Sequence, residues 1–122
     1  SSVPATQVAS VSDVDLTAGA ATIDLTSLTN GFGDALDGTG LKVQLFYFRS
    51  AADNTDTITI VDGATNGYNI FGDAAGQVTV PVGGTILWEG DDALDDIAAG
   101  DATIDLSSSD TDATYSYVIV MG

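Results

Sequence analysis

The sequence contains no cysteine and no histidine, and Lys42 and Arg49 are its only basic residues. These absences exclude disulfide bonds, thiolate nucleophiles and the imidazole that most often moves protons or binds metals at neutral pH. Two cations are also too few to neutralise the phosphates along a nucleic acid. We therefore expect a non-enzymatic protein that does not bind DNA or RNA.

Most charged residues are acidic: 18 Asp and Glu against two basic residues give the 122-residue chain a net charge of −16. Such a charge repels anionic membrane surfaces and nucleic acid and keeps a protein soluble. The 44% of hydrophobic residues nevertheless predicts a folded chain rather than a disordered one. Apolar runs such as 117–121 are too short to span a membrane, so we expect no membrane association. No signal peptide opens the sequence, which favours cytoplasmic synthesis, although a processed secreted protein would look the same.

Apolar and polar residues alternate with period two along most of the chain, which predicts β-strands. The stronger strand predictions are 21–26, 41–49, 57–61, 77–80, 85–88 and 115–120, and the weaker ones are 11–16, 68–71 and 102–106. Turn residues separate them, at Asn30-Gly31, Asp62-Gly63, Asn66-Gly67 and Gly83-Gly84. In the segment 91–99, Leu94 and Ile97 have helical spacing, which allows one helical turn at most.

This pattern predicts an all-β fold, an antiparallel β-sandwich of jelly-roll type with about eight or nine short strands. The length fits a single domain over residues 1–122. Residues 21–27 nearly repeat as 102–108, and we interpret them as two equivalent strands of a doubled β topology. In both, Ile and Leu should face the core while Asp24 and Asp105 face solvent.

Clustered aspartates raise the question of a calcium site, because Ca²⁺ takes six to eight oxygen ligands. Asp91, Asp92, Asp95 and Asp96 are the candidate ligands, followed by Asp101. The segment lacks the alternating ligands, central glycine and terminal glutamate of an EF-hand loop. We therefore favour a solvated loop, keep an ordered divalent cation as the alternative, and expect no other cofactor.

A glycosidase would need two carboxylates at a fixed separation, one of them beside an apolar group that raises its pKa. Glu89 next to Trp88 is the only local candidate. Adjacent strand residues point to opposite faces, so we expect Trp88 to face the core and Glu89 to face solvent. A sugar-binding module is a stronger alternative, with Tyr47, Tyr68, Tyr115 and Tyr117 as candidates to stack on pyranose rings.

Several segments together resemble the small β-rich structural proteins that tailed phages and related viruses place on or near their capsids. The resemblance rests on residues 23–28, 40–48, 58–60, 63–72, 80–84 and 97–106. It implies a capsid decoration or head-associated protein on the virion exterior, made in the host cytoplasm and bound in many copies to the major capsid protein. It carries no catalytic motif and transfers no site residue.

For such a role we expect contacts through segments of low charge at both ends of the chain and in the 30–40 loop. Residues 1–10 are a candidate extended arm that contacts a neighbour, and self-association into a homo-oligomer is expected. The candidate interface residues are Val3, Pro4, Phe32, Tyr115, Tyr117 and Met121. A secreted surface-array or filament subunit built by strand exchange remains a further alternative.

Overall fold

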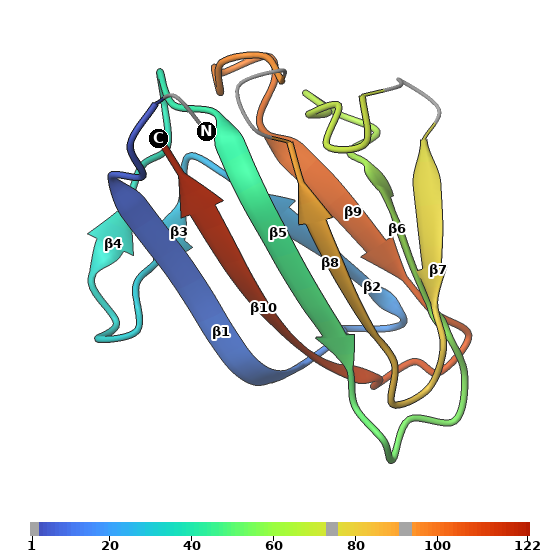
Figure 1. The fold of residues 1–122 in the computed structure, drawn as a ribbon. Coiled ribbons are helices and arrows are strands. Elements are labelled where there is room, and N and C mark those ends of the chain that lie inside the picture. The colour runs from blue at the N-terminus through green and yellow to red at the C-terminus, as the bar shows by residue number, and fades with distance from the viewer. Residues whose placement is uncertain (1–2, 73–75, 91–93) are drawn as a thin grey trace.

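The computed structural model describes residues 3–72, 76–90 and 94–122 as an all-β structure of ten strands (Figure 1). The strands are β1 (Gln7–Asp15), β2 (Ala20–Asp24), β3 (Leu28–Thr29), β4 (Ala35–Leu36), β5 (Val43–Ser50), β6 (Ile58–Asp62), β7 (Gln77–Val80), β8 (Thr85–Glu89), β9 (Thr103–Ser107) and β10 (Thr114–Met121). Residues 3–72, 76–90 and 94–122 include no helix that could span a membrane.

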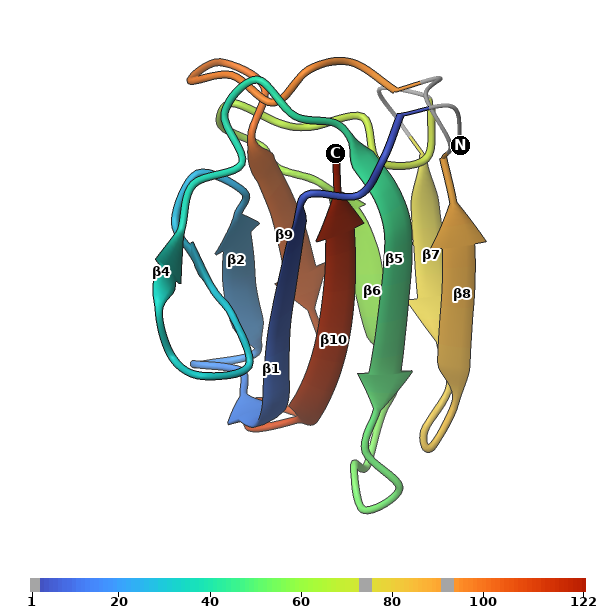
Figure 2. The same cartoon turned by 60° about the vertical axis from the view of Figure 1, so that its left-hand side comes forward.

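Eight of these strands form two four-stranded antiparallel sheets that lie face to face (Figure 2). Sheet A has the order β1-β10-β5-β8, and sheet B has the order β2-β9-β6-β7. The eight strands pair from the outside of the sequence inward: β1 pairs with β10, β2 with β9, β5 with β8, and β6 with β7. This pairing is that of a long antiparallel ribbon rolled up on itself, which is a jelly roll. The predicted fold class is confirmed.

The near-repeat in the sequence has a direct place in this topology, because its two copies are β2 and β9. Ile23 lies opposite Ile104 in the register of the two strands, so a local two-fold axis relates the copies. Both isoleucines are buried, whereas Asp24 and Asp105 are only half-buried on the outer side. Asp105 accepts hydrogen bonds from the Thr22 hydroxyl and the Ala64 amide. The aspartates therefore tie neighbouring segments to the sheet.

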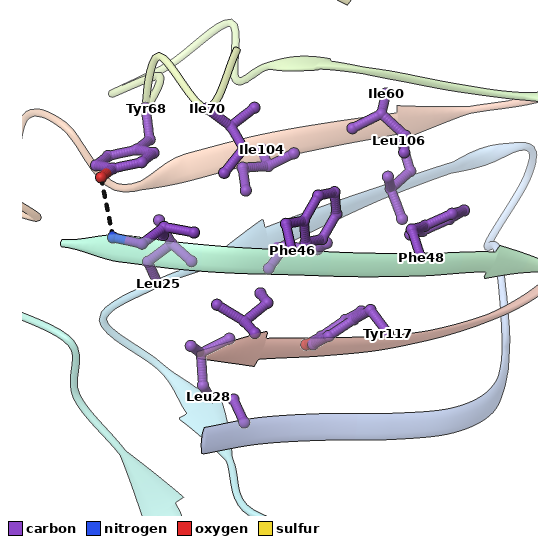
Figure 3. Packing of buried hydrophobic residues seen from close by; sticks show 14 of the residues in the cluster. Leu25, Leu28, Phe46, Phe48, Ile60, Tyr68, Ile70, Ile104, Leu106 and Tyr117 are labelled. Carbon is purple, nitrogen blue, oxygen red and sulfur yellow. Dashed lines mark hydrogen bonds between the residues drawn. The ribbon is translucent and has the colours of Figure 1, made fainter. Parts of the chain in front are cut away.

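The core lies between the two sheets and follows the alternation of side chains along each strand (Figure 3). Phe46 and Phe48 of β5 are fully buried, and Ile60 of β6 and Leu106 of β9 lie on the opposing sheet. Phe48, Tyr115 and Tyr117 continue as a row of stacked rings, with centroids 5.7 and 6.3 Å apart. Aromatic burial of this kind supplies much of the hydrophobic stabilisation of a small sandwich.

Two buried side chains close the ends of the sandwich by hydrogen bonding to backbone. The Tyr68 hydroxyl accepts from the Val43 amide at 3.2 Å, drawn in Figure 3, and donates to the Asp95 carbonyl at 2.8 Å. Burial raises the pKa of Tyr68 to about 12, so the hydroxyl keeps the proton that it donates. At the other end, the Asn54 side chain donates from Nδ2 to the Thr114 carbonyl and accepts at Oδ1 from the Thr114 backbone amide. Asn54 thereby continues the pairing of sheet A beyond β5.

Three local predictions from the sequence were wrong or incomplete. Residues 68–71 do not form a strand: Ile70 donates to the Tyr68 carbonyl and Gly72 to the Asn69 carbonyl, so the segment is a series of turns that buries Tyr68 and Ile70. Residues 94–99 contain no helical turn, and 91–93 lie outside the described residues. Leu94 and Ile97 instead anchor an extended loop to the core. The two-residue strands β3 and β4 were not predicted, because they are too short to show a period.

The N-terminal segment is more tightly integrated than a free arm. Residues 7–10 belong to β1 and pair with residues 118–121 of β10. Before them, the Thr6 amide donates to the Met121 carbonyl, and the Gln44 side chain donates to the Val3 carbonyl at 2.8 Å. Within the described chain, residues 3–6 therefore lie against their own sandwich, and a contact of this segment with a neighbour remains a proposal.

Candidate interaction surfaces

The hairpin of β3 and β4 holds a phenylalanine almost entirely in solvent. The Asn30 side-chain oxygen accepts hydrogen bonds from the Phe32 amide at 2.8 Å and the Asp34 amide at 3.0 Å. Gly33 completes the turn with a φ of 83° and donates to the Asn30 carbonyl, a conformation that glycine adopts without strain. These bonds fix residues 30–34, here called the Phe32 turn, and leave the Phe32 side chain 93% exposed. The predicted interface residue Phe32 is thus available for contact.

The other predicted interface residues divide into surface and core. Val3 and Pro4 are exposed at the start of the described chain. Tyr115, Tyr117 and Met121 are buried, because they occupy the inward-facing positions of β10. Their side chains pack in the core and offer no surface of this chain to a partner.

The outward-facing positions of the same sheet form a surface of unusual composition. Strand register places Val8, Val120 and Leu45 in one row across β1, β10 and β5, and Val118, Tyr47 and Leu87 in the next row across β10, β5 and β8. Leu87 is 64% exposed and Val8 is 49% exposed, while the others are half-buried. We call this surface the apolar face, defined as Val8, Leu45, Tyr47, Leu87, Val118 and Val120. The four strands that carry it lie in front in Figure 1.

Opposite charges mark two corners of the apolar face. Glu89 lies next to Leu45 in the first row, and Arg49 lies next to Thr85 in the row beyond Tyr47. Both side chains are exposed. The apolar face itself carries no carboxylate, although the chain has 18 acidic residues.

The outer surface of sheet B has the opposite character. Its outward positions in β2, β9, β6 and β7 are mainly threonine, serine and aspartate, including Thr22, Asp24, Thr59, Thr79, Thr103, Asp105 and Ser107. We call this surface the polar face. A polar exterior is the ordinary outcome for an antiparallel sheet with one side in water, so the apolar face is the exception.

The candidate calcium ligands are not assembled into a site in the described chain. Asp91 and Asp92 lie outside the described residues, and Asp95 and Asp96 are exposed. Asp96 pairs with Lys42 at 2.8 Å, and the same ammonium donates to the Leu94 carbonyl. Among the residues that the structure describes, no group of three or more carboxylates could hold a metal ion.

Other carboxylates gather at the opposite end of the sandwich, where they bind backbone and hydroxyl donors. A depression of about 260 Å³ is lined by Asp15, Asp53, Asp110 and Asp112 together with Asn54, Thr55 and Thr114. Asp110 accepts from the Thr55 amide, which is the largest cause of the lowered pKa of Asp110. Asp15 accepts from the Thr114 hydroxyl at 2.7 Å. Asp110 thus joins the loop after β5 to the loop before β10, and Asp15 joins the end of β1 to the start of β10.

The side chains considered for sugar chemistry point in different directions. Trp88 faces inward and packs edge-on against Phe71, with ring centroids 6.4 Å apart, while Glu89 is exposed; the predicted orientation of this pair is confirmed. Of the tyrosines considered for stacking on sugars, Tyr68, Tyr115 and Tyr117 are buried. Tyr47 alone of the four reaches the outer surface, so the tyrosines form no shared stacking platform.

Comparisons with known proteins identify a shared fold but no protein family. No protein-family model matches the chain, and no curated protein matches it. A solved protein of the Bacillus endospore appendages, described as a family of disulfide-linked pili, superposes with a TM-score of 0.53 at 12% identity, over 99% of this chain and 90% of that one. The Tobacco streak virus coat protein superposes with a TM-score of 0.50 at 12% identity, over 95% of this chain and 85% of that one. Likeness at this identity establishes a shared fold.

Proposed function

We propose that this protein is a non-enzymatic structural component of a virion, a decoration protein that binds the outside of the shell through the Phe32 turn. The observation that carries the proposal is the 93% exposure of Phe32 on a turn fixed by the Asn30 side chain. Exposing a phenylalanine to water is unfavourable for an isolated chain. A rigidly held aromatic that enters a pocket on a partner is the usual anchor of a protein interface.

Other features of the molecule support a structural role. Carboxylates such as Asp105 and Asp96 bind a backbone amide, a hydroxyl or Lys42, and Asp110 and Asp15 in the depression near Asn54 accept hydrogen bonds from Thr55 and Thr114. The coat protein of Tobacco streak virus shares the fold, so a jelly roll of this kind is suited to a place in a shell. With a net charge of −16, the chain fits the exterior of a particle better than a position against packaged nucleic acid. Its partner in this role is the major capsid protein.

The proposal is tested by binding to shells assembled from the major capsid protein of the virus whose genome encodes this chain. The purified protein is mixed with shells and sedimented through sucrose, and the bound copies are counted by gel densitometry. We expect saturation at a fixed ratio to the capsid protein. Phe32→Ser should weaken binding at least about tenfold, since an aromatic anchor typically contributes ~2 kcal/mol or more.

Val82→Ser is the matched control, because Val82 is also an exposed apolar side chain but lies in the turn between β7 and β8. It should leave shell binding unchanged. Failure of the wild-type protein to sediment with shells, or equal losses for the two variants, would reject the proposal.

One observation favours a second candidate, an extracellular filament subunit. In the described structure β8 pairs only with β5, so its outer edge can accept a strand from another chain. The pilus protein of the Bacillus endospore appendages has the same fold. This chain has no cysteine, so such a filament would be held by strand addition without disulfides. Filaments of the purified protein in negative-stain micrographs would favour this candidate over the decoration protein.

A further inference from the structure

The apolar face is an outer surface whose composition neither the core nor the Phe32 turn explains. Its six side chains come from β1, β10, β5 and β8 and point away from sheet B. Four strands about 4.8 Å apart and five residues at about 3.4 Å each give a flat patch of roughly 300 Å². A patch of this size is comparable to the largest apolar patch on an ordinary monomer, which is often functional, and here it lies on a protein with a net charge of −16.

The charges at its corners indicate which protein covers it. Arg49 and Glu89 lie on the same side of sheet A but at opposite ends of their paired strands, because Arg49 is opposite Thr85 while Glu89 is opposite Leu45. About four residues of extended strand separate them, some 13 Å, so they do not pair within one chain. Arg49 lines a depression together with Asp13 and Asp53 of its own chain, whereas the row that contains Glu89 has no basic residue. A second copy of this chain can satisfy both charges.

We propose that two copies of this protein pair through their apolar faces about a two-fold axis that runs parallel to the row of Val118, Tyr47 and Leu87. Rotation about this axis places the row of Val118, Tyr47 and Leu87 against the same row of the partner subunit. The row that contains Glu89 then faces the partner's row that contains Arg49, and the reverse. Arg49 then lies diagonally across from Glu89 of the partner subunit, and the symmetry forms this pair twice. Packed sheets are about 10 Å apart, a distance that an arginine and a glutamate span together.

The net charge explains why the contact uses this face. Two chains of −16 repel one another, and the repulsion is strongest where carboxylates meet in a surface that excludes water. The apolar face is free of carboxylates, so its burial brings no acidic groups together. The patch is smaller than the about 800 Å² per partner of a standard stable interface. The pair is therefore weak and depends on concentration, and copies held side by side on a larger assembly strengthen it by avidity.

Sedimentation equilibrium of the full chain over a range of concentrations tests this contact, because it needs no shell and does not involve Phe32. We expect a reversible monomer–dimer equilibrium that strengthens with NaCl as repulsion is screened. Leu87→Glu should abolish dimerisation. Thr79→Glu adds the same charge at an exposed position of β7 on the polar face and should leave the dimer intact. A wild-type protein that stays monomeric at all concentrations, or a Leu87→Glu variant that still dimerises, would overturn the proposal.

A charge exchange tests the symmetry of the pair. Arg49→Glu and Glu89→Arg should each weaken dimerisation, because each brings like charges together across the two-fold axis. The double variant R49E/E89R restores unlike charges at both corners and should restore the dimer. If the double variant is as weak as the single ones, the arrangement about this axis is wrong. Thermal melting of each variant confirms that it folds, and Phe32→Ser should dimerise as the wild type does.

Discussion

At the scale of single residues, the hydroxyl of Tyr68 is the most consequential polar group in the core. It satisfies the Val43 amide and the Asp95 carbonyl in a position where the side chain is 1% exposed. Removing one partner of a buried hydrogen bond leaves the other unsatisfied, which typically costs about 1–3 kcal/mol. We expect Tyr68→Phe to lower the free energy of unfolding by that amount in urea denaturation. Tyr47→Phe, in which the ring lies on the outer surface of β5, should change it far less.

Two aspartates should respond to neutralisation with opposite signs. Burial, and then the nearby charge of Asp95, raise the pKa of Asp101, whereas hydrogen bonds from the Thr39 hydroxyl and amide lower the pKa of Asp37. The raised pKa of Asp101 means that folding favours its protonated form. Protonated Asp101 therefore contributes to stability below the ordinary pKa of 3.8, and this contribution is lost as the pH rises through the raised pKa. A lowered pKa means the reverse: the contribution is present above 3.8 and is lost as the pH falls through the lowered value.

At pH 7 we therefore expect Asp101→Asn to raise the melting temperature slightly and Asp37→Asn to lower it. Both differences from the wild type should shrink as the pH is lowered, and that of Asp101→Asn should shrink first. Because each substitution removes one negative charge, a simple relief of repulsion would raise both melting temperatures. Melting curves between pH 7 and pH 3 distinguish the two explanations.

Residue-level prediction from the sequence identified the surface position Phe32 but misplaced the residues of β10. The inward positions of β10 include Tyr115, Tyr117 and Met121, while the outward positions begin with Thr114 and Ser116 and continue with Val118 and Val120. Period two predicts the strand, but it does not distinguish the inner from the outer side over residues 117–121, where the positions on both sides are apolar. The structure settles the orientation, because Tyr115 stacks on the buried Phe48 of the neighbouring strand β5 on the inner side of sheet A. The apolar face was missed for the same reason.

At the scale of elements, the junction between β6 and β9 depends on a glycine. A Cβ built on Gly63 would overlap the Thr103 side chain, and the Gly63 amide donates to the Thr103 carbonyl at 2.9 Å. Gly63→Ala should therefore destabilise the protein by about 1–3 kcal/mol, the usual effect of forcing extra atoms into a packed site. Gly100→Ala is the matched control, since nothing lies within 4 Å of a Cβ at Gly100. Chemical denaturation that ranks the two variants equally would contradict this account.

Most strands were predictable because apolar and polar residues alternate over at least four positions of each, and a turn residue follows. The predicted strand 77–80 coincides with β7, and 85–88 falls one residue short of β8. β1 was predicted at 11–16 but runs from Gln7 to Asp15. Its pairing with β10 shifts in register between Val11 and Val14, where Asp13 has a φ of 53°. This bulge interrupts the alternation, and the residues before it were therefore assigned to an arm.

At the scale of the whole molecule, charge repulsion acts against the compact state. The net charge of −16 resides on a chain with only two basic residues, and salt shortens the range of the repulsion from about 30 Å at 0.01 M to about 3 Å at 1 M. We expect the melting temperature to rise by several degrees over this range, equally in NaCl and KCl. No change with salt would mean that repulsion contributes little. An additional rise with millimolar CaCl₂ at constant ionic strength would indicate a specific calcium site.

The order of strands across the two sheets also determines when the molecule can be completed. β10 lies between β1 and β5 in sheet A, and β9 lies between β2 and β6 in sheet B. Until a ribosome has synthesised β9 and β10, the earlier strands have gaps where their central partners belong. The nascent chain therefore exposes unpaired strand edges until synthesis is nearly complete. It reaches its native state late, because contacts between residues far apart in the sequence form slowly. Cells that make this protein in quantity should depend on chaperones during that interval.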